Sequence, residues 1–333
     1  MMVDHIRRSL VMAALLGVSG LARAADRVTL PGGGSYPDHL IRFVVPLPAG
    51  GGADIVARLI AQQLSQDLGQ PVVIENRPGG GTVIGAEAVA RSRPDGYTLL
   101  LGTATTHATN ISLYENLPYD PVTDFEPIAL VAVLPLILVI NPSVPVNSLQ
   151  ELIEYARKRP GKLNFASTGN GSSIHLAGEM LKMVAGIDIV HVPYKGATPA
   201  LTDLLGGQVQ FMFTTIPPAL PHVKAGKLKA LCVANAKRSS ILPDLPTTAE
   251  AGAPGVEASS WNGVLAPART PPEIVGMLDK RIAKVMQVPE IVSKLNAGGT
   301  EPSYLPAREF ARFISDETAR YAKVIKTAHV HIN

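Results

Sequence analysis

From Leu40 onward, short apolar runs alternate along the chain with stretches whose apolar residues recur every three or four positions. The first pattern is typical of buried strands and the second of amphipathic helices. Strands that alternate with helices predict parallel sheets covered on both faces. The expected strands are Ile41–Val45, Val72–Glu75, Tyr97–Leu101, Ile128–Leu134, Leu136–Ile140, Leu163–Ala166, Ile189–Val192, Val209–Phe213, Leu228–Ala234 and Trp261–Ala266.

After Trp261–Ala266 the pattern predicts only helices, over Pro272–Gln287, Glu290–Asn296 and from Ala307 to about Ala328. Because these helices have no strands of their own to cover, we expect the chain to cross back and pack them on the first sheet. This predicts an α/β fold of two domains with two hinge crossings, which closes on a ligand. The expected domains are residues 39–138 plus 262–333, and residues 139–261.

The N-terminus has the features of a secretory signal peptide over residues 1–24. Arg7 and Arg8 precede an apolar run, Leu10–Val18, and Ala22-Arg23-Ala24 is typical of a cleavage site. The run is shorter than the roughly 20 residues of a membrane span. We therefore expect a soluble, exported, periplasmic protein with a flexible leader over residues 25–38.

Export also changes the charge. Removal of Asp4 and of three arginines in the signal lowers the formal net charge from +3 to +1, so nucleic acid is not an expected partner. Cys232 is the only cysteine, which excludes a disulfide within the chain. Its apolar surroundings predict a buried, inert thiol.

Three expected strands run directly into loops rich in Gly, Ser and Thr, where a helix begins. These loops are Pro46–Gly52, Gly102–Thr106 and Ser167–Ser173. The first N–H groups of such a helix are unpaired and lie at its positive end, so they bind anions without Arg or Lys. In sheets of this kind, ligands bind beyond the carboxyl ends of the strands. The pattern predicts a receptor for a small acid.

Other chemistries find little support. Ser172 and His175 suggest a hydrolase, but the chain has no G-x-S-x-G elbow and no acid at a triad spacing, so a helix cap explains them better. No histidines have the spacing of a zinc site, and the terminal pair His329 and His331 is expected to face solvent. Gly79–Gly85 lacks the dinucleotide register, and no P-loop lysine occurs. We expect no metal and no cofactor.

Several segments, in this order along the chain, resemble the Bug family, the periplasmic solute-binding proteins of tripartite tricarboxylate transporters. The resemblance runs from about Ile41 to the C-terminus. The segments that carry it are Val44–Asp54, Val73–Gly81, Pro94–Leu99, His191–Gly196 and Pro199–Gly207.

The resemblance implies a periplasmic clamshell of the Venus flytrap type (type II), usually monomeric, without cofactor and without catalysis. It also implies that backbone amides of the strand–helix loops and a pair of bound waters hold a ligand carboxylate, with residues 194–196 at the far end of the ligand. The candidate ligand-binding residues are Pro48, Ala49, Gly50, Gly51, Gly52, Asp54, Thr103, Thr106, His107, Ser167, Thr168, Gly169, Gly171, Ser172, His175, Tyr194, Lys195, Gly196 and Thr214.

Two positions depart from the family pattern. Where the family commonly has Asp-Asn, this chain has Thr214-Thr215, and Val83 replaces an Asn. Because an Asp could neutralise a ligand ammonium group, its absence favours a carboxylate without an amine.

The expected function is capture of a small organic carboxylate in an interdomain cleft and its delivery to the permease of a tripartite tricarboxylate transporter. An extracytoplasmic receptor for a sensor kinase is the alternative, since both use the closed surface. A periplasmic hydrolase is the third. A function as the effector domain of a transcriptional regulator is a remote alternative, because the predicted signal peptide occupies the place where a DNA-binding domain would have to be.

Overall fold

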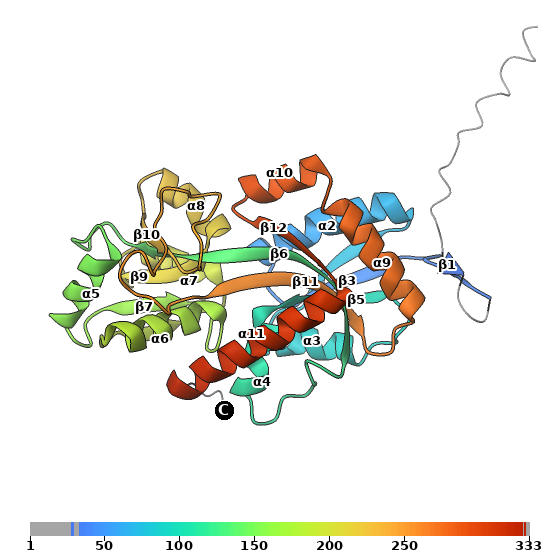
Figure 1. Cartoon of the computed structure of the whole chain (residues 1–333), viewed down its shortest axis with the longest axis horizontal. Helices are drawn as coiled ribbons and strands as arrows, with labels where there is room; N and C mark the ends of the chain where they lie inside the picture. Colours follow the sequence, from blue (N-terminus) through green and yellow to red (C-terminus); the bar gives the residue numbers. More distant parts are fainter. Residues whose placement is uncertain (1–27, 30–32, 329, 331–333) are drawn as a thin grey trace, which may run out of the picture.

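The computed structural model describes residues 28–29, 33–328 and 330. The predicted signal peptide, the start of the leader, His329 and His331 lie outside the described residues. Figure 1 shows an elongated α/β molecule built around one mixed sheet.

The sheet has the strand order β4-β3-β5-β11-β6-β9-β7-β8, and β10 and β12 also pair with β6. The strands are β3 (Ile41–Val45), β4 (Val72–Asn76), β5 (Thr98–Thr103), β6 (Phe125–Ile140), β7 (Asn164–Ser167), β8 (Val190–Pro193), β9 (Phe211–Thr215), β10 (Lys229–Val233), β11 (Ser259–Pro267) and β12 (Glu301–Pro306). The pairs β3–β4, β3–β5, β7–β8 and β7–β9 are parallel, whereas β6 and β11 run antiparallel to their neighbours.

Helices cover both faces of this sheet. They are α2 (Gly52–Leu68), η1 (Gly80–Thr82), α3 (Val83–Ala90), η2 (Thr105–Thr109), α4 (Asn110–Leu113), α5 (Leu149–Arg157), α6 (Ser173–Ala185), α7 (Ala197–Leu205), α8 (Ile216–Lys224), α9 (Pro272–Val285), α10 (Pro289–Ala297) and α11 (Ala307–Ala328). Figure 1 shows α2, α9 and α10 on one side of the sheet and α3, α4 and α11 on the other. Helix α9 packs on β6 and α2, and α11 packs on β6, so these C-terminal helices return to the sheet as expected. Cys232 is fully buried, also as predicted.

Strand β6 corrects the prediction of two separate strands, Ile128–Leu134 and Leu136–Ile140. It is one continuous strand, whose first part pairs with β11 and β12 and whose last part pairs with β9 and β10. Pro135 lies where both neighbours change, and a proline is best tolerated where a ladder is interrupted. The strand therefore physically joins the two halves of the sheet.

The segment after residue 266 is also different from the prediction, because it contains β12 as well as helices. This strand pairs antiparallel with β6. It carries Pro302 and Pro306, and all its residues are half-buried, so it has neither the apolar run nor the alternation by which a strand is recognised.

The end of the expected leader is held against the protein. Val28–Thr29 (β1) pairs with Ser35–Tyr36 (β2), and Tyr36 is fully buried, with its hydroxyl donating to the carbonyl of Gly96 at 2.8 Å. A single buried aromatic residue produces no periodic pattern, which is why the sequence did not reveal it. Val28–Thr29 and Ser35–Tyr36, which fall within the predicted leader, are therefore part of the folded protein.

Candidate functional site

The glycine-rich loop between β3 and α2 leaves the start of α2 open. Its N-cap, Gly51, has no side chain to hydrogen-bond the first-turn amides. Gly50 has a φ of +83°, a conformation that favours glycine. The unpaired N–H groups at this end of a long helix carry its partial positive charge. The loop can therefore accept an anion through its backbone.

Asp54, in the first turn of α2, holds this loop in shape. Its carboxylate accepts hydrogen bonds from the Gly50 N–H at 2.9 Å, the Arg58 guanidinium at 2.8 Å and the Asn76 amide at 2.9 Å. The same Asn76 amide also donates to the carbonyl of Leu47 at 3.1 Å. Burial alone would raise the pKa of Asp54, but these hydrogen bonds outweigh it and lower the pKa. Asp54 is thus a charged brace whose acceptor atoms face the protein.

The loop lies against the starts of two helices from the other half of the sheet. A Cβ atom on Gly52 would lie 3.6 Å from Pro217 Cγ and 3.8 Å from Thr215 Oγ1. A Cβ atom on Gly196 would lie 3.8 Å from Pro48 Cγ. These residues stand at the starts of α8 and α7, and neither helix has a side-chain cap. Three helix starts without side-chain caps therefore converge at one place.

The three starts are not equivalent as donors. Pro217 and Pro218 lack N–H groups, so α8 offers fewer backbone donors than α2 or α7. Thr215 contributes its hydroxyl at this point instead. Thr214 is fully buried, and its Oγ1 has no hydrogen-bond partner.

In the third predicted loop, between β7 and α6, several polar groups bond one another. Ser172 Oγ accepts from the His175 N–H at 3.2 Å and donates to the Gly169 carbonyl at 2.8 Å, which confirms the predicted helix cap. The Gly171 N–H donates to His175 Nδ1 at 3.0 Å. The hydroxyl of Ser172 is therefore engaged with the backbone and does not bond the His175 ring, so it lacks the arrangement of an activated nucleophile.

This loop touches both halves of the molecule. The Tyr194 N–H donates to the Ser167 carbonyl at 3.0 Å, and the Tyr194 hydroxyl donates to Asp203 at 2.7 Å. A Cβ atom on Gly171 would collide with the side chain of Leu113 in α4. Gly171 is thus the point at which the β7–α6 loop rests on the other half. Lys195, next to Tyr194, is exposed.

In the second predicted loop, after β5, the structure corrects the predicted role of one residue, His107. Thr103 and Thr106 bond each other, the Thr103 N–H donating to Thr106 Oγ1 at 2.8 Å. His107 turns into the core, fully buried, with its ring 4.8 Å from that of Phe125 and 6.4 Å from that of Trp261. Burial lowers its pKa to about 3, so it is neutral. In this conformation His107 cannot contact a solute, because the junction winds as the π-helix η2 and buries the ring.

The candidate ligand-binding residues do not include four residues of this region. Asn76 follows a predicted strand and carries a short amide beside a glycine-rich turn, which is a usable signal. Thr215, Pro217 and Leu113 reach the site only through contacts with residues far away in the sequence, so no local pattern marks them.

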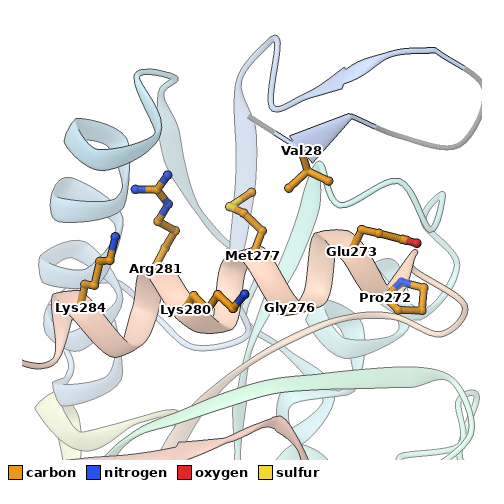
Figure 2. A pocket seen from close by; sticks show the side chains of 8 residues that line it. All are labelled: Val28, Pro272, Glu273, Gly276, Met277, Lys280, Arg281 and Lys284. Atoms are coloured by element: carbon orange, nitrogen blue, oxygen red, sulfur yellow. The ribbon is translucent and has the colours of Figure 1, made fainter. Parts of the chain in front are cut away.

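Two other hollows lie elsewhere. The one in Figure 2, about 510 Å³, lies along α9 beside β1, and Arg281 at its edge pairs with Asp67 at 2.9 Å. The other, about 520 Å³, is lined by α4 and the segment before β6. None of the candidate ligand-binding residues lines either hollow.

Within the part of the chain that the structure describes, no group of three or more His, Cys, Asp or Glu side chains could hold a metal ion. No helix formed by the same residues combines the length and the apolar character needed to cross a membrane.

Comparison with known proteins adds a family and three relatives. The TctC model, described as "Tripartite tricarboxylate transporter family receptor", matches residues 56–330. Protein BugT of Bordetella pertussis is 39% identical over 317 residues, which cover 95% of this chain and 97% of BugT. The solved structure titled "R. palustris Rpa4515 with adipate" is 42% identical with a TM-score of 0.86, over 89% of this chain and 99% of that one. The structure of MatC from Rhodopseudomonas palustris with bound malate is 34% identical, with a TM-score of 0.80. The match covers 87% of this chain and 100% of MatC.

Proposed function

This chain belongs to the TctC family, the receptors of tripartite tricarboxylate transporters, and from that premise we propose that it captures a small organic carboxylate and delivers it to a permease of that type. It is a solute receptor, and receptors of this family are not enzymes. The family, the periplasmic-binding-protein fold class and the non-catalytic function predicted from the sequence are thereby confirmed.

The convergence of three helix starts without side-chain caps carries the proposal. Gly52 of α2 lies beside Thr215 at the start of α8, and Pro48 lies beside Gly196 at the start of α7. A carboxylate among them would receive backbone hydrogen bonds and the field of three helix termini, with no counter-ion needed. The nearby Asp54 does not oppose this, because its charge is already balanced by Arg58 and the loop amides.

Thr214 and Thr215 stand where the family commonly has Asp-Asn, and this supports a ligand without an amine. Rpa4515 has been solved with adipate and MatC with malate, and neither ligand carries an ammonium group. The Thr215 hydroxyl at the end of β9 suits a carboxylate or hydroxyl oxygen, whereas an ammonium group would find no partner charge there and would lose its hydration. The proposed ligand class is a carboxylate without an amine, aliphatic or aromatic.

The candidate residues divide in this proposal between contact and support. Gly51, Gly52, Gly196 and Thr215 would contact the ligand, while Asp54 and Asn76 keep the first loop in shape. Because the contacts come from both halves of the sheet, the ligand would favour the closed arrangement of domains 39–138 plus 262–333 and 139–261. Export through the predicted signal peptide would place this receptor in the periplasm, beside its permease.

A calorimetric and thermal-shift panel tests the proposal. It compares adipate, malate, succinate and benzoate with aspartate and glutamate, after native mass spectrometry for a copurified acid. A true ligand at one hundred times its dissociation constant should stabilise the protein by roughly 2.7 kcal/mol. Tighter binding of aspartate or glutamate than of every amine-free acid would refute the ligand class. Failure of all carboxylates would refute carboxylate capture itself.

A further inference from the structure

Two histidines stack at the base of the β7–α6 loop. The rings of His175 in α6 and His191 in β8 lie 3.8 Å apart, only 16° from parallel. His191 Nε2 lies 2.6 Å from Ser167 Oγ, and that hydroxyl also accepts the Gly169 N–H at 3.1 Å. The pair therefore bonds to both ends of the loop, through Ser167 on one side and Gly171 on the other.

The hydrogen bond between Gly171 and His175 forms only when His175 Nδ1 carries no proton. The Gly171 N–H donates to His175 Nδ1 at 3.0 Å, so Nδ1 must present a lone pair. A proton on Nδ1 would place two donors face to face. Gly171 has a φ of +72° and rests on Leu113 of the opposite half, so the direction of its N–H decides how the loop meets α4.

The residues around the stack do not supply enough negative charge to balance two protonated rings. Glu179 lies 3.6 Å from His175 Nε2 and is shared with Lys182 at 3.8 Å. The neighbouring strand β7 contributes Phe165, whose ring lies 5.0 Å from that of His191 and carries no charge. On α11, which packs against α6, Glu317 and Arg320 already pair at 2.7 Å. One shared carboxylate thus faces two stacked imidazoles.

The behaviour of His191 agrees with this arrangement. Burial, and next the neighbouring His175, lower the pKa of His191 to about 4. The charged form of the His191 ring is therefore disfavoured in the folded protein.

We propose that the His175–His191 stack is a positioning device, which holds the β7–α6 loop in its ligand-binding shape only while both rings are neutral. Protonation of the pair breaks the Gly171–His175 hydrogen bond, loosens the contact with Leu113 and weakens ligand capture. The last step rests on the proposed function, whereas the loop response does not.

Amide NMR of the ligand-free protein tests the loop response directly. Between about pH 7.5 and about pH 3.5, a range that spans the His191 pKa of about 4, the Gly171 amide of the wild type should lose its hydrogen-bonded shift. Its protection factor, which corrects for the intrinsic pH dependence of amide exchange, should fall roughly tenfold. His175→Asn places an amide oxygen near the position of Nδ1 and takes up no proton, so its Gly171 amide should stay nearly constant. His39→Asn is the control, because His39 is an exposed histidine bonded to Asp38. An unchanged pH response in His175→Asn would refute the proposal.

A second variant guards against misfolding of the first. His191→Phe keeps a stacked ring but cannot take up a proton, so the part of the Gly171 response near the His191 pKa of about 4 should disappear. An unchanged response of the Gly171 amide in His191→Phe would also overturn the proposal.

Adipate binding is the functional arm. The ligand takes up protons in the same range, so the informative quantity is the rise in its dissociation constant on acidification, compared between wild type and His175→Asn. We expect the wild-type rise to be about tenfold larger, roughly the value of one hydrogen bond. Equal rises in the two proteins would refute the proposed link to capture. If neither protein binds adipate at about pH 7.5, the proposed ligand fails, while the amide titration still decides the role of the stack.

Discussion

Helices α2 and α6 both begin directly after a strand in a glycine-rich loop, yet they treat their first amides in opposite ways. At α6, Ser172 caps the helix and the His175 ring takes up the Gly171 N–H. At α2, Gly51 has no side chain to cap the helix. The backbone amide that Asp54 accepts from is that of Gly50, which lies one residue before the N-cap. Similar composition thus produces one closed and one open helix start.

The difference shows where the anion-binding capacity lies. A helix start whose N–H groups are bonded by its own side chains has few donors left for a ligand. The β7–α6 loop therefore contributes mainly through its shape and its contact with the other half. An open start that is braced from behind keeps its donors and pays little ordering entropy when the ligand arrives. The first loop should therefore dominate affinity, and the third should dominate the response to pH.

Among the substitutions at the two helix starts, Gly52→Asp should cause the largest loss of carboxylate affinity. The new carboxylate would lie at the open start of α2 beside Thr215 and occupy the place of the ligand. Since facing like charges cost several kcal/mol, carboxylate affinity should fall at least about a hundredfold. A Cβ atom at position 52 would lie 3.3 Å from Leu134 Cδ2, so the melting temperature should also fall slightly. Calorimetry and thermal unfolding measure both. Gln150→Asp, an equal charge change at the exposed start of α5, is the control, and retained binding in Gly52→Asp would contradict the assigned site.

Asp54→Ala should be next in size. It leaves Gly50 and Asn76 without their acceptor and releases Arg58, so the free energy of unfolding should fall by about 2–3 kcal/mol. The freed loop must then be ordered on binding, which should weaken affinity about tenfold. Urea unfolding and calorimetry at neutral pH check both values.

The same variant has a pH signature. Because the pKa of Asp54 is lowered by folding, its contribution is complete above the unfolded pKa and is lost as pH falls through the folded one. Asp54→Ala should therefore lose less stability on acidification than the wild type. Asp67→Ala breaks a comparable pair with Arg281 away from the loops and should leave ligand affinity unchanged. Equal losses of affinity in the two variants would remove the special role of Asp54.

Ser172→Ala should have the smallest effect and sharpen the contrast. Loss of the cap should cost about 1 kcal/mol in unfolding free energy. Because the Gly171–His175 bond remains, affinity should change by no more than about threefold. A much larger loss of binding would mean that the Ser172 hydroxyl itself contacts the ligand.

Local patterns in the sequence predicted much of this protein. The strand–loop–helix junctions, the Ser172 cap, the burial of Cys232 and the family all follow from neighbouring residues or from ordered motifs. Such features depend on interactions within a few positions of the chain, and these are the interactions that periodicity and capping rules describe.

Tertiary structure alone decided the remainder. It joined two predicted strands into β6, added β12, buried Tyr36 and turned His107 into the core. It also brought Gly52 to Thr215, and Asn76 to Asp54. Each of these outcomes depends on residues far apart in the chain, whose contact gains its energy only when both halves of the sheet have formed. The sequence determined which helices could begin without a cap, and the packing of the two halves determined which of them meet.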